Sequence, residues 1–181
     1  MHTISRILLV ILYLASTCLL FASEELDPAA YLDYPEVKAY VEYFTTGEKK
    51  RWLESALARG EVYNEYISDR IAEFSLPEAL KYLPVIESGC NPRAVSPSGA
   101  AGLWQFMLNS IGPYDLHVNE WIDERKDFWK STTASLKKLS YNKAELGDWL
   151  LAIAAYNCGI NRLKKILEDS PGTDYWELSR G

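Results

Sequence analysis

Histidine is scarce in this chain, and its scarcity excludes several kinds of catalytic site. The sequence contains 2 histidines, His2 and His117, and His2 lies in an N-terminal segment that resembles a targeting signal. The single histidine outside this segment argues against a Ser-His-Asp triad and is too few for a histidine-rich metal site. His117 is predicted to be a surface or loop residue. The usual phosphate-binding glycine motifs are also missing, so we expect neither a metal nor a cofactor.

An excess of positive charge is missing as well. The formal net charge is −6 and the isoelectric point is near 5.0, which argues against a nucleic-acid partner. The short basic run at residues 49–51 lies beside Glu48 and Glu54, so it is interpreted as a solvated helix face. Strand patterns are nearly absent, whereas 48% hydrophobic and 13% aromatic residues are enough for a packed core. The 181 residues favour one globular domain with additional segments, and we expect a monomer.

Cysteine is sparse, with 3 residues in the whole chain. Cys18 lies in the N-terminal segment, which leaves Cys90 and Cys158 for the folded part. These are too few for a disulfide framework. An oxidising compartment would permit a bridge between them, but geometry decides whether one forms. We expect two small buried thiols.

The N-terminus has the pattern of a targeting segment. Arg6 precedes an apolar run over residues 7–21, and the small residues Ala22 and Ser23 follow. This order predicts a secretory signal over residues 1–23. The run is short for a bilayer span of roughly 20 residues, so an uncleaved membrane anchor stays open, as does lipidation at Cys18. Either way, the protein is expected to work in the periplasm or cell envelope.

Helical spacing dominates the remaining chain. A lead-in region, residues 24–75, is predicted to contain three helices, over 35–46, 52–59 and 62–74, with Gly47 and Gly60 as the breaks between them. Ser75 and Glu78 are predicted to form a capping box that starts the next helix. Pro84 is expected to kink that helix.

The last part of the chain, residues 76–181, is predicted to be the main helical domain. Residues 91–102 read as a loop, and short helices are expected over 103–109, 128–141 and 160–168. Asp148 is a plausible N-cap for residues 149–157, which are apolar on nearly all sides and predict a central buried helix. Gly159 suits a left-handed residue at its end, and no closing element is evident after Leu178. The expected fold class is mainly α.

Glu87 is the candidate acid. It follows the apolar run 82–86 and precedes Ser88 and Gly89, where the helix should stop. Desolvation at the edge of a cleft raises a carboxyl pKa, and a helix C-terminus raises it further. A carboxyl group that stays protonated near neutral pH is what the cleavage of a glycosidic bond requires.

Three motifs surround this glutamate in the sequence. They are E-S-G-C-N-P-R-A-V-S at residues 87–96, G-A-A-G-L-W-Q-F-M at residues 99–107 and A-A-Y-N-C-G at residues 154–159. In order and spacing they resemble the signature motifs of the lytic transglycosylases, the family that shares a lysozyme-like catalytic domain of the goose type. The lead-in helices are similar to those of the membrane-bound type D subgroup, and the resemblance covers residues 35–178. It implies that residues 76–181 are the catalytic domain.

The resemblance implies a set of site residues. Glu87 would be the sole catalytic acid and base, and Ser88 would help to hold it. Residues matching sugar-cleft positions are Ser96, Gln105 and Met107, and residues matching those that face the glutamate from the central helix are Tyr156 and Asn157. Among the tryptophans, Trp104 is a candidate for sugar stacking, whereas Trp52, Trp149 and Trp176 are predicted to be core residues.

The resemblance also implies the reaction. Peptidoglycan glycan strands would be cut between N-acetylmuramic acid and N-acetylglucosamine, with a 1,6-anhydro product. Asp123, Glu124, Asp127 and Asp148 are the other carboxylates considered for a two-carboxylate hydrolase. A lysozyme-like muramidase and an inactive peptidoglycan-binding protein stay open as alternatives. Cys90 departs from the family, which usually has an aromatic residue there, and the family's domain normally continues past Leu178, which would make this domain a truncated one.

Overall fold

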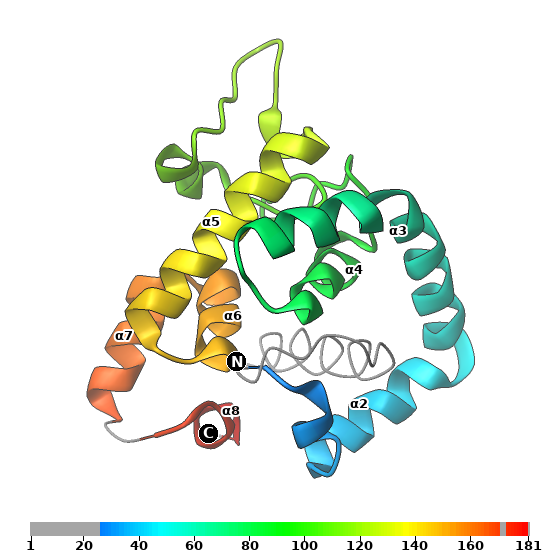
Figure 1. Ribbon diagram of the computed structural model, residues 1–181, viewed down its shortest axis with the longest axis vertical. Coiled ribbons are helices and arrows are strands. Elements are labelled where there is room, and N and C mark those ends of the chain that lie inside the picture. The colour runs from blue at the N-terminus through cyan, green and yellow to red at the C-terminus, as the bar shows by residue number, and fades with distance from the viewer. Residues whose placement is uncertain (1–25, 171–172, 181) are drawn as a thin grey trace.

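A computed structural model describes residues 26–170 and 173–180, and the regular structure within them is helical (Figure 1). The α-helices are α2 (Pro35–Thr45), α3 (Gly47–Glu73), α4 (Leu83–Ser88), α5 (Phe128–Leu146), α6 (Trp149–Cys158), α7 (Ile160–Asp169) and α8 (Tyr175–Arg180). Short 3-10 helices are η1 (Pro28–Tyr31), η2 (Glu78–Tyr82), η3 (Leu108–Ser110), η4 (Gly112–Tyr114) and η5 (Glu124–Lys126). The described residues form only isolated β-bridges. The predicted fold class, mainly α, is confirmed.

The predicted targeting segment lies outside the described residues. Within residues 26–170 and 173–180, no helix is both long enough and apolar enough to cross a membrane.

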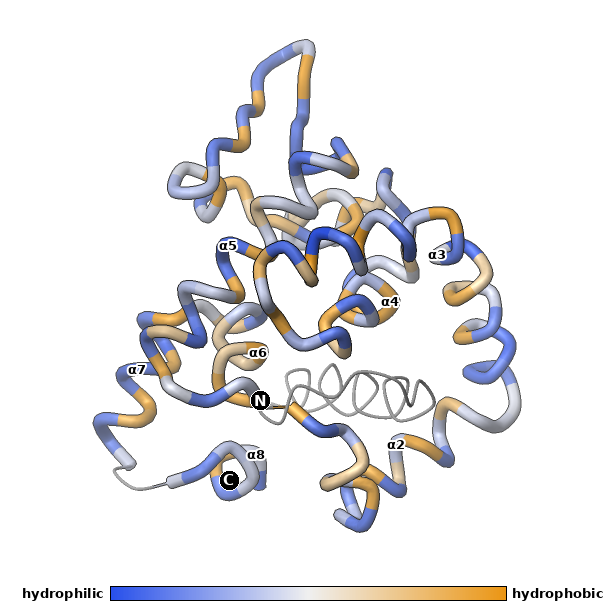
Figure 2. The backbone as a smooth tube through the Cα atoms, viewed as in Figure 1, coloured by the Kyte–Doolittle hydropathy of each residue, from blue (hydrophilic) through white to orange (hydrophobic). Residues whose placement is uncertain are grey.

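The helices form two groups around α4. Helix α3 arches around α4 on one side, and α5, α6 and α7 pack together on the other (Figure 1). Figure 2 shows α6 as predominantly apolar, whereas α3 and α5 alternate hydrophilic and hydrophobic residues along their length. An apolar helix must be covered on several sides, while an amphipathic one needs cover on one face only. Helix α6 therefore takes the central place.

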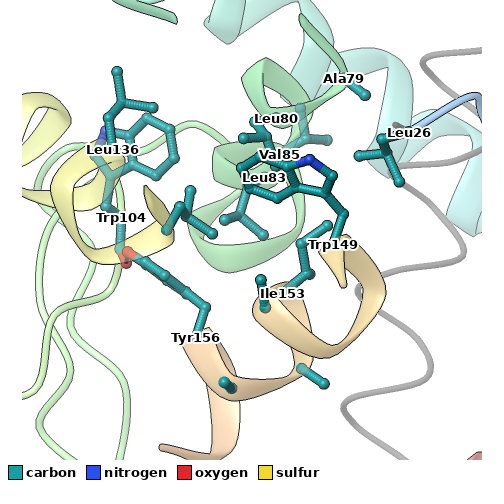
Figure 3. Close-up of a cluster of buried hydrophobic side chains, with 14 of the residues drawn as sticks. Leu26, Ala79, Leu80, Leu83, Val85, Trp104, Leu136, Trp149, Ile153 and Tyr156 are labelled. Atoms are coloured by element: carbon teal, nitrogen blue, oxygen red, sulfur yellow. Dashed lines mark hydrogen bonds between the residues drawn. The ribbon is translucent and has the colours of Figure 1, made fainter. Parts of the chain in front are cut away.

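Helix α6 confirms the predicted central buried helix. The Asp148 carboxylate accepts a hydrogen bond of 2.8 Å from the Leu151 amide, which satisfies one of the free amides of the first turn. Trp149 and Ile153 point from α6 towards Leu80 and Leu83 (Figure 3), and all four side chains are at most 4% exposed. Burial of each such side chain contributes roughly 1.5–3 kcal/mol. Gly159 ends the helix with a φ of +87°, although its ψ of 135° is not that of a left-handed helix.

Gly60 does not end a helix, contrary to the prediction. Helix α3 runs without a break through this position. The glycine there allows close packing against Cys90 and does not terminate the helix. A Cβ atom there would lie 3.0 Å from the Sγ atom of Cys90. The break at Gly47 is confirmed, since Thr46 is extended between α2 and α3.

The predicted start of the next helix is also wrong. Ser75 has a φ of +54° and does not cap. Glu78 instead accepts hydrogen bonds from Ser68 (2.7 Å) and Lys81 (2.8 Å). Pro84 lies in the first turn of α4, where its missing N–H costs nothing, so the chain breaks into η2 and α4 rather than kinking.

Among the segments after residue 90, some predictions are confirmed and others are corrected. Residues 91–102 form the expected loop, and the helices expected over 128–141 and 160–168 are present with later ends. Residues 103–109 are mostly turns rather than a helix, because Gln105 has a φ of +51°. The C-terminal part has a packing element that the sequence did not suggest, the short helix α8. Its Trp176 is buried, as is Trp149, so both are core residues as predicted.

The two cysteines of the described part are free thiols. Cys90 is buried as expected, whereas Cys158 is half-buried at the edge of the cleft described below.

Candidate active site

A cleft of about 720 Å³ lies where the two groups of helices meet. Its volume is within the usual range for small-molecule sites. It brings together every predicted site residue except Ser88. The residues that line it are Tyr43, Phe44, Lys49, Trp52, Ile86, Glu87, Ser96, Ser98, Ala100, Gln105, Met107, Asn109, Ser110, Lys138, Tyr156, Asn157, Cys158 and Gly159.

Glu87 enters this cleft from the last turn of α4. The helix stops directly after it, because Gly89 adopts a left-handed conformation with a φ of +60°, which costs a glycine little. The amides of Gly89 and Cys90 then donate to the carbonyls of Val85 and Pro84, each at 3.0 Å. Arg59 of α3 donates to the Gly89 carbonyl at 2.9 Å. The end of the helix, and with it the backbone of Glu87, is held from both sides.

The Glu87 carboxyl group is desolvated. Its Oε1 atom is buried and has no hydrogen-bond partner among the described residues. Burial raises the pKa of this carboxyl group from 4.5 to about 7, against the opposing effect of the nearby Lys138 ammonium. At neutral pH a large fraction of Glu87 therefore carries a proton that it can donate.

Lys138 of α5 is a site residue that sequence reasoning missed. Its ammonium group donates to the Tyr156 carbonyl at 3.1 Å and lies 4.2 Å from the centre of the Tyr156 ring and 5.5 Å from that of Phe106. Burial lowers the pKa of Lys138, while Glu87 opposes the shift. The sequence signals only an amphipathic helix here, because position 138 reaches the cleft only through the packing of α5 on α6.

Ser88 lies behind the cleft rather than in its lining. Its hydroxyl donates to the carbonyls of Leu103 (2.8 Å) and Pro84 (3.2 Å) and accepts from the Asn91 amide at 3.1 Å. It thereby connects the end of α4 to the second motif, next to Glu87.

The loop motifs form the polar wall of the cleft. The Ser96 hydroxyl is 2.9 Å from that of Ser98 and accepts from the Ala100 amide at 3.0 Å. The Gln105 amide group donates to the Gly102 carbonyl at 2.8 Å, and Met107 is 37% exposed at the rim. Hydroxyls and amides of this kind can donate to or accept from the hydroxyl and acetamido groups of a sugar.

Tyr156 and Asn157 come from the end of α6. The Tyr156 hydroxyl donates to the Trp104 carbonyl at 2.8 Å and lies 2.9 Å from the Ser135 hydroxyl. Figure 3 shows this side chain pointing towards Trp104, inside the core. Tyr156 therefore presents ring atoms to the cleft and keeps its hydroxyl in a buried network, whereas Asn157 is exposed. Trp104 itself is 0% exposed, so it is a core residue and not available for stacking on a sugar.

Arg125 is a second residue that sequence reasoning missed. Its guanidinium group pairs with both carboxylate oxygens of Asp123, each at 2.8 Å, and donates to the carbonyls of Gly99 (2.9 Å) and Phe106 (3.2 Å). These bonds fix the second motif at two points. The backbone of Arg125 also packs closely against Gly102. Only glycine allows this approach, because a Cβ atom at position 102 would lie 1.7 Å from the Arg125 carbonyl oxygen. Arg125 thus holds the polar wall in place without entering the cleft.

The other four carboxylates considered from the sequence bind partners outside the cleft. Asp123 pairs with Arg125, and Glu124 pairs with Lys130 and accepts from the His117 amide. The carboxylate of Asp127 caps α5, and that of Asp148 caps α6. Among residues 26–170 and 173–180, Glu87 is the single carboxylic acid that lines the cleft.

The described residues form a helical domain with a central buried helix and a protonatable glutamate in a cleft, an arrangement that fits a lysozyme-like domain. The family model described as the transglycosylase SLT domain matches residues 67–179. This match spans more than half of the chain, so the chain belongs to the SLT transglycosylase domain family. The resemblance that the three motifs carry is thereby confirmed.

Two curated relatives agree with this assignment. The membrane-bound lytic murein transglycosylase D of Escherichia coli strain K12 is 36% identical over 134 residues, which make up 71% of this chain and 30% of that protein. The protein of the same name from Escherichia coli O6:H1 gives the same values. The chain therefore matches less than a third of the length of these relatives.

Proposed function

We propose that this protein is a lytic transglycosylase of the cell envelope that cuts the glycan strands of peptidoglycan, with Glu87 as its acid and base. The observation that carries the proposal is that Glu87 is the single carboxylic acid among the described residues that line the cleft. Most glycosidases that hydrolyse use a pair of carboxylates, about 5–9.5 Å apart. The described part of this cleft has one, and a non-hydrolytic route needs only one.

The proposed reaction balances without water. The protonated Glu87 carboxyl donates its proton to the bridging oxygen, and the bond from C1 of N-acetylmuramic acid to that oxygen breaks. The 2-acetamido group of the same sugar stabilises the positive charge that develops at C1. The ionised Glu87 then takes the proton of the C6 hydroxyl, whose oxygen bonds to C1. Glu87 ends protonated, as it began, and the product is a 1,6-anhydro sugar.

Two features of the site support Glu87 in both roles. Desolvation keeps the carboxyl group protonated for the first step, since its pKa is raised to about 7. The neighbouring Lys138 charge stabilises the carboxylate that exists between the two steps. Ser96 and Gln105 of the polar wall, together with Asn157 of α6, offer partners for sugar hydroxyl and acetamido groups.

The test is a digest of purified peptidoglycan sacculi with the full chain and with its Glu87→Gln variant, read by mass spectrometry. We expect anhydro-muropeptides from the wild type and none from Glu87→Gln. Glu120→Gln is the matched control, because Glu120 is exposed and outside the cleft, so that variant should keep full activity.

Other products would lead to other conclusions. Reducing-end muropeptides, heavier by one water, would identify a muramidase. Sacculi that bind the folded wild type but release nothing would identify a peptidoglycan-binding protein.

A further inference from the structure

Part of the cleft lining is aromatic, and this part, which we call the aromatic wall, comes from the lead-in helices. Tyr43 and Phe44 lie at the end of α2, and Trp52 lies in the second turn of α3. All three precede residue 67, where the match to the family model begins. Trp52 was predicted to be a core residue, and that prediction is wrong. It is 38% exposed, and Tyr43 is 46% exposed.

The aromatic rings form a connected strip. The Tyr43 and Phe44 rings meet edge to face with centres 4.9 Å apart, and the Phe44 and Trp52 rings are 5.9 Å apart. Contacts of this kind fix the orientation of the exposed rings before anything binds. Lys49 lies 5.6 Å over the Tyr43 ring, which gives the strip a cationic donor at its edge.

Trp52 is also held close to the catalytic glutamate. The Cζ2 atom of its indole is 3.6 Å from the place that a Cβ atom on Gly89 would occupy. Gly89 is two residues beyond Glu87, so the indole packs against the turn that ends α4. The aromatic strip is therefore continuous with the cleft into which Glu87 projects.

We propose that this strip, Tyr43, Phe44 and Trp52, is a stacking subsite for a sugar ring of the same glycan strand whose bond Glu87 cleaves. A pyranose has polarised C–H bonds on its faces and hydroxyl groups around its edge. Aromatic faces carry partial negative charge that attracts such C–H groups, and the polar wall of the same cleft can bind the edge. A cleft that is lined by both aromatic rings and polar groups matches this two-sided chemistry.

The inference rests on the proposed function for the nature of the ligand, but its test does not require turnover. The full chain carrying Glu87→Gln is titrated with chitopentaose and, separately, sedimented with purified sacculi. Trp52→Ala added to this background should weaken both interactions by roughly threefold to tenfold, the equivalent of one aromatic stacking contact. Trp52→Phe should retain most of the affinity, because it keeps an aromatic face. Tyr43→Leu, which keeps an apolar side chain, should weaken binding in the same direction.

The matched control is Trp121→Ala, since Trp121 is 90% exposed and does not line the cleft. Circular dichroism and thermal unfolding establish that each variant is folded. Unchanged affinity in folded Trp52→Ala and Tyr43→Leu would overturn the subsite, as would an equal loss in Trp121→Ala. With cleavage-competent chains, the same substitutions should raise KM for glycan and leave kcat nearly unchanged. If the wild-type chain forms no anhydro product, that result would instead count against the proposed reaction and not against the subsite.

Discussion

Lys138 places a positive charge beside Glu87, the one carboxylic acid among the described residues that line the cleft. A cation near a carboxyl group favours its ionised form and lowers its pKa. Desolvation is the larger effect on Glu87 and raises its pKa to about 7. The protonated, proton-donating form is therefore present below this value and is lost as the pH rises through it.

We expect kcat/KM of the wild type to fall above a pH of about 7, and Lys138→Met to move this fall to higher pH. The substitution keeps the length of the side chain and removes the charge that lowers the pKa of Glu87. Other groups that face Lys138 are Tyr156 and Cys158, and their pKa values are raised by burial, so neither acquires charge in this range. Rates of release of anhydro-muropeptides between pH 5 and 9 measure the effect.

Lys137→Met is the control for this prediction. Lys137 lies on the same helix but pairs with Asp115 at 3.7 Å on the surface, so its profile should match the wild type. Lys138→Arg should restore the wild-type profile. An unmoved profile in Lys138→Met would show that the residue acts only through packing.

At the scale of single elements, the close approach of α3 to the turn after α4 depends on Gly60. Glycine in a helix interior costs about 0.5–1 kcal/mol relative to alanine. Glycine is present here despite this cost because Cys90 lies against the helix and leaves little room for a side chain. Cys90 is buried and has its own φ of +57°, so the contact between Gly60 and Cys90 fixes how α3 meets the turn that follows Glu87.

Gly60→Ala should stabilise the protein by about 0.5–1 kcal/mol when Cys90 is also alanine, through the better helix propensity. With the native cysteine, the new methyl group meets Sγ at 3.0 Å and much of the gain should be lost. Urea unfolding of the two single variants, the double variant and the wild type measures this coupling. Strictly additive effects would contradict the proposed contact.

The element scale also separates what could be predicted from what could not. Helices α2, α5, α6 and α7 follow from periodicity, caps and glycine breaks, which act within a few residues. The errors at Gly60 and at residues 103–109 share one cause, because contacts with distant segments override the local preference there. Cys90 packs against Gly60, and the Arg125 guanidinium binds the carbonyls of Gly99 and Phe106. The error at Ser75 is local. Its left-handed conformation ends α3, where the Ser75 amide donates to the Ala72 carbonyl and the Leu76 amide donates to the Ile71 carbonyl.

At the scale of the whole molecule, the two ends of the described chain pack together. Trp176 of α8 stacks on Tyr34 with ring centres 4.3 Å apart and lies 5.6 Å from Tyr31. Arg180 donates to Glu36 at 2.8 Å. Figure 1 shows α8 between α7 and the segment that leads into α2. These contacts close the core beside α6.

Trp176→Ala should lower the free energy of unfolding by about 3–5 kcal/mol, because it removes a large aromatic side chain that is buried and leaves a cavity. Trp129→Ala is the control, since Trp129 is 61% exposed and its loss should cost about 0.5 kcal/mol or less. Thermal and urea unfolding provide the values. Equal losses for the two variants would show that α8 does not hold the core together.

The sequence alone was enough to predict the fold class, the family and the place of Glu87 at the cleft, because the signals for all three lie in short stretches of sequence. The role of Glu87 as the acid stays a prediction. An apolar helix, three motifs and a helix stop after a glutamate need no knowledge of distant contacts. The full set of residues around the cleft could not be predicted in this way. Lys138 and Trp52 reach the cleft only because α5 packs on α6 and α3 wraps around α4. Arg125 supports the polar wall from outside the cleft through its bonds to Gly99 and Phe106. Such packing buries apolar surface between segments far apart in the chain. Side-chain direction, and with it the aromatic wall and the charge beside Glu87, is set by that packing and not by any local pattern.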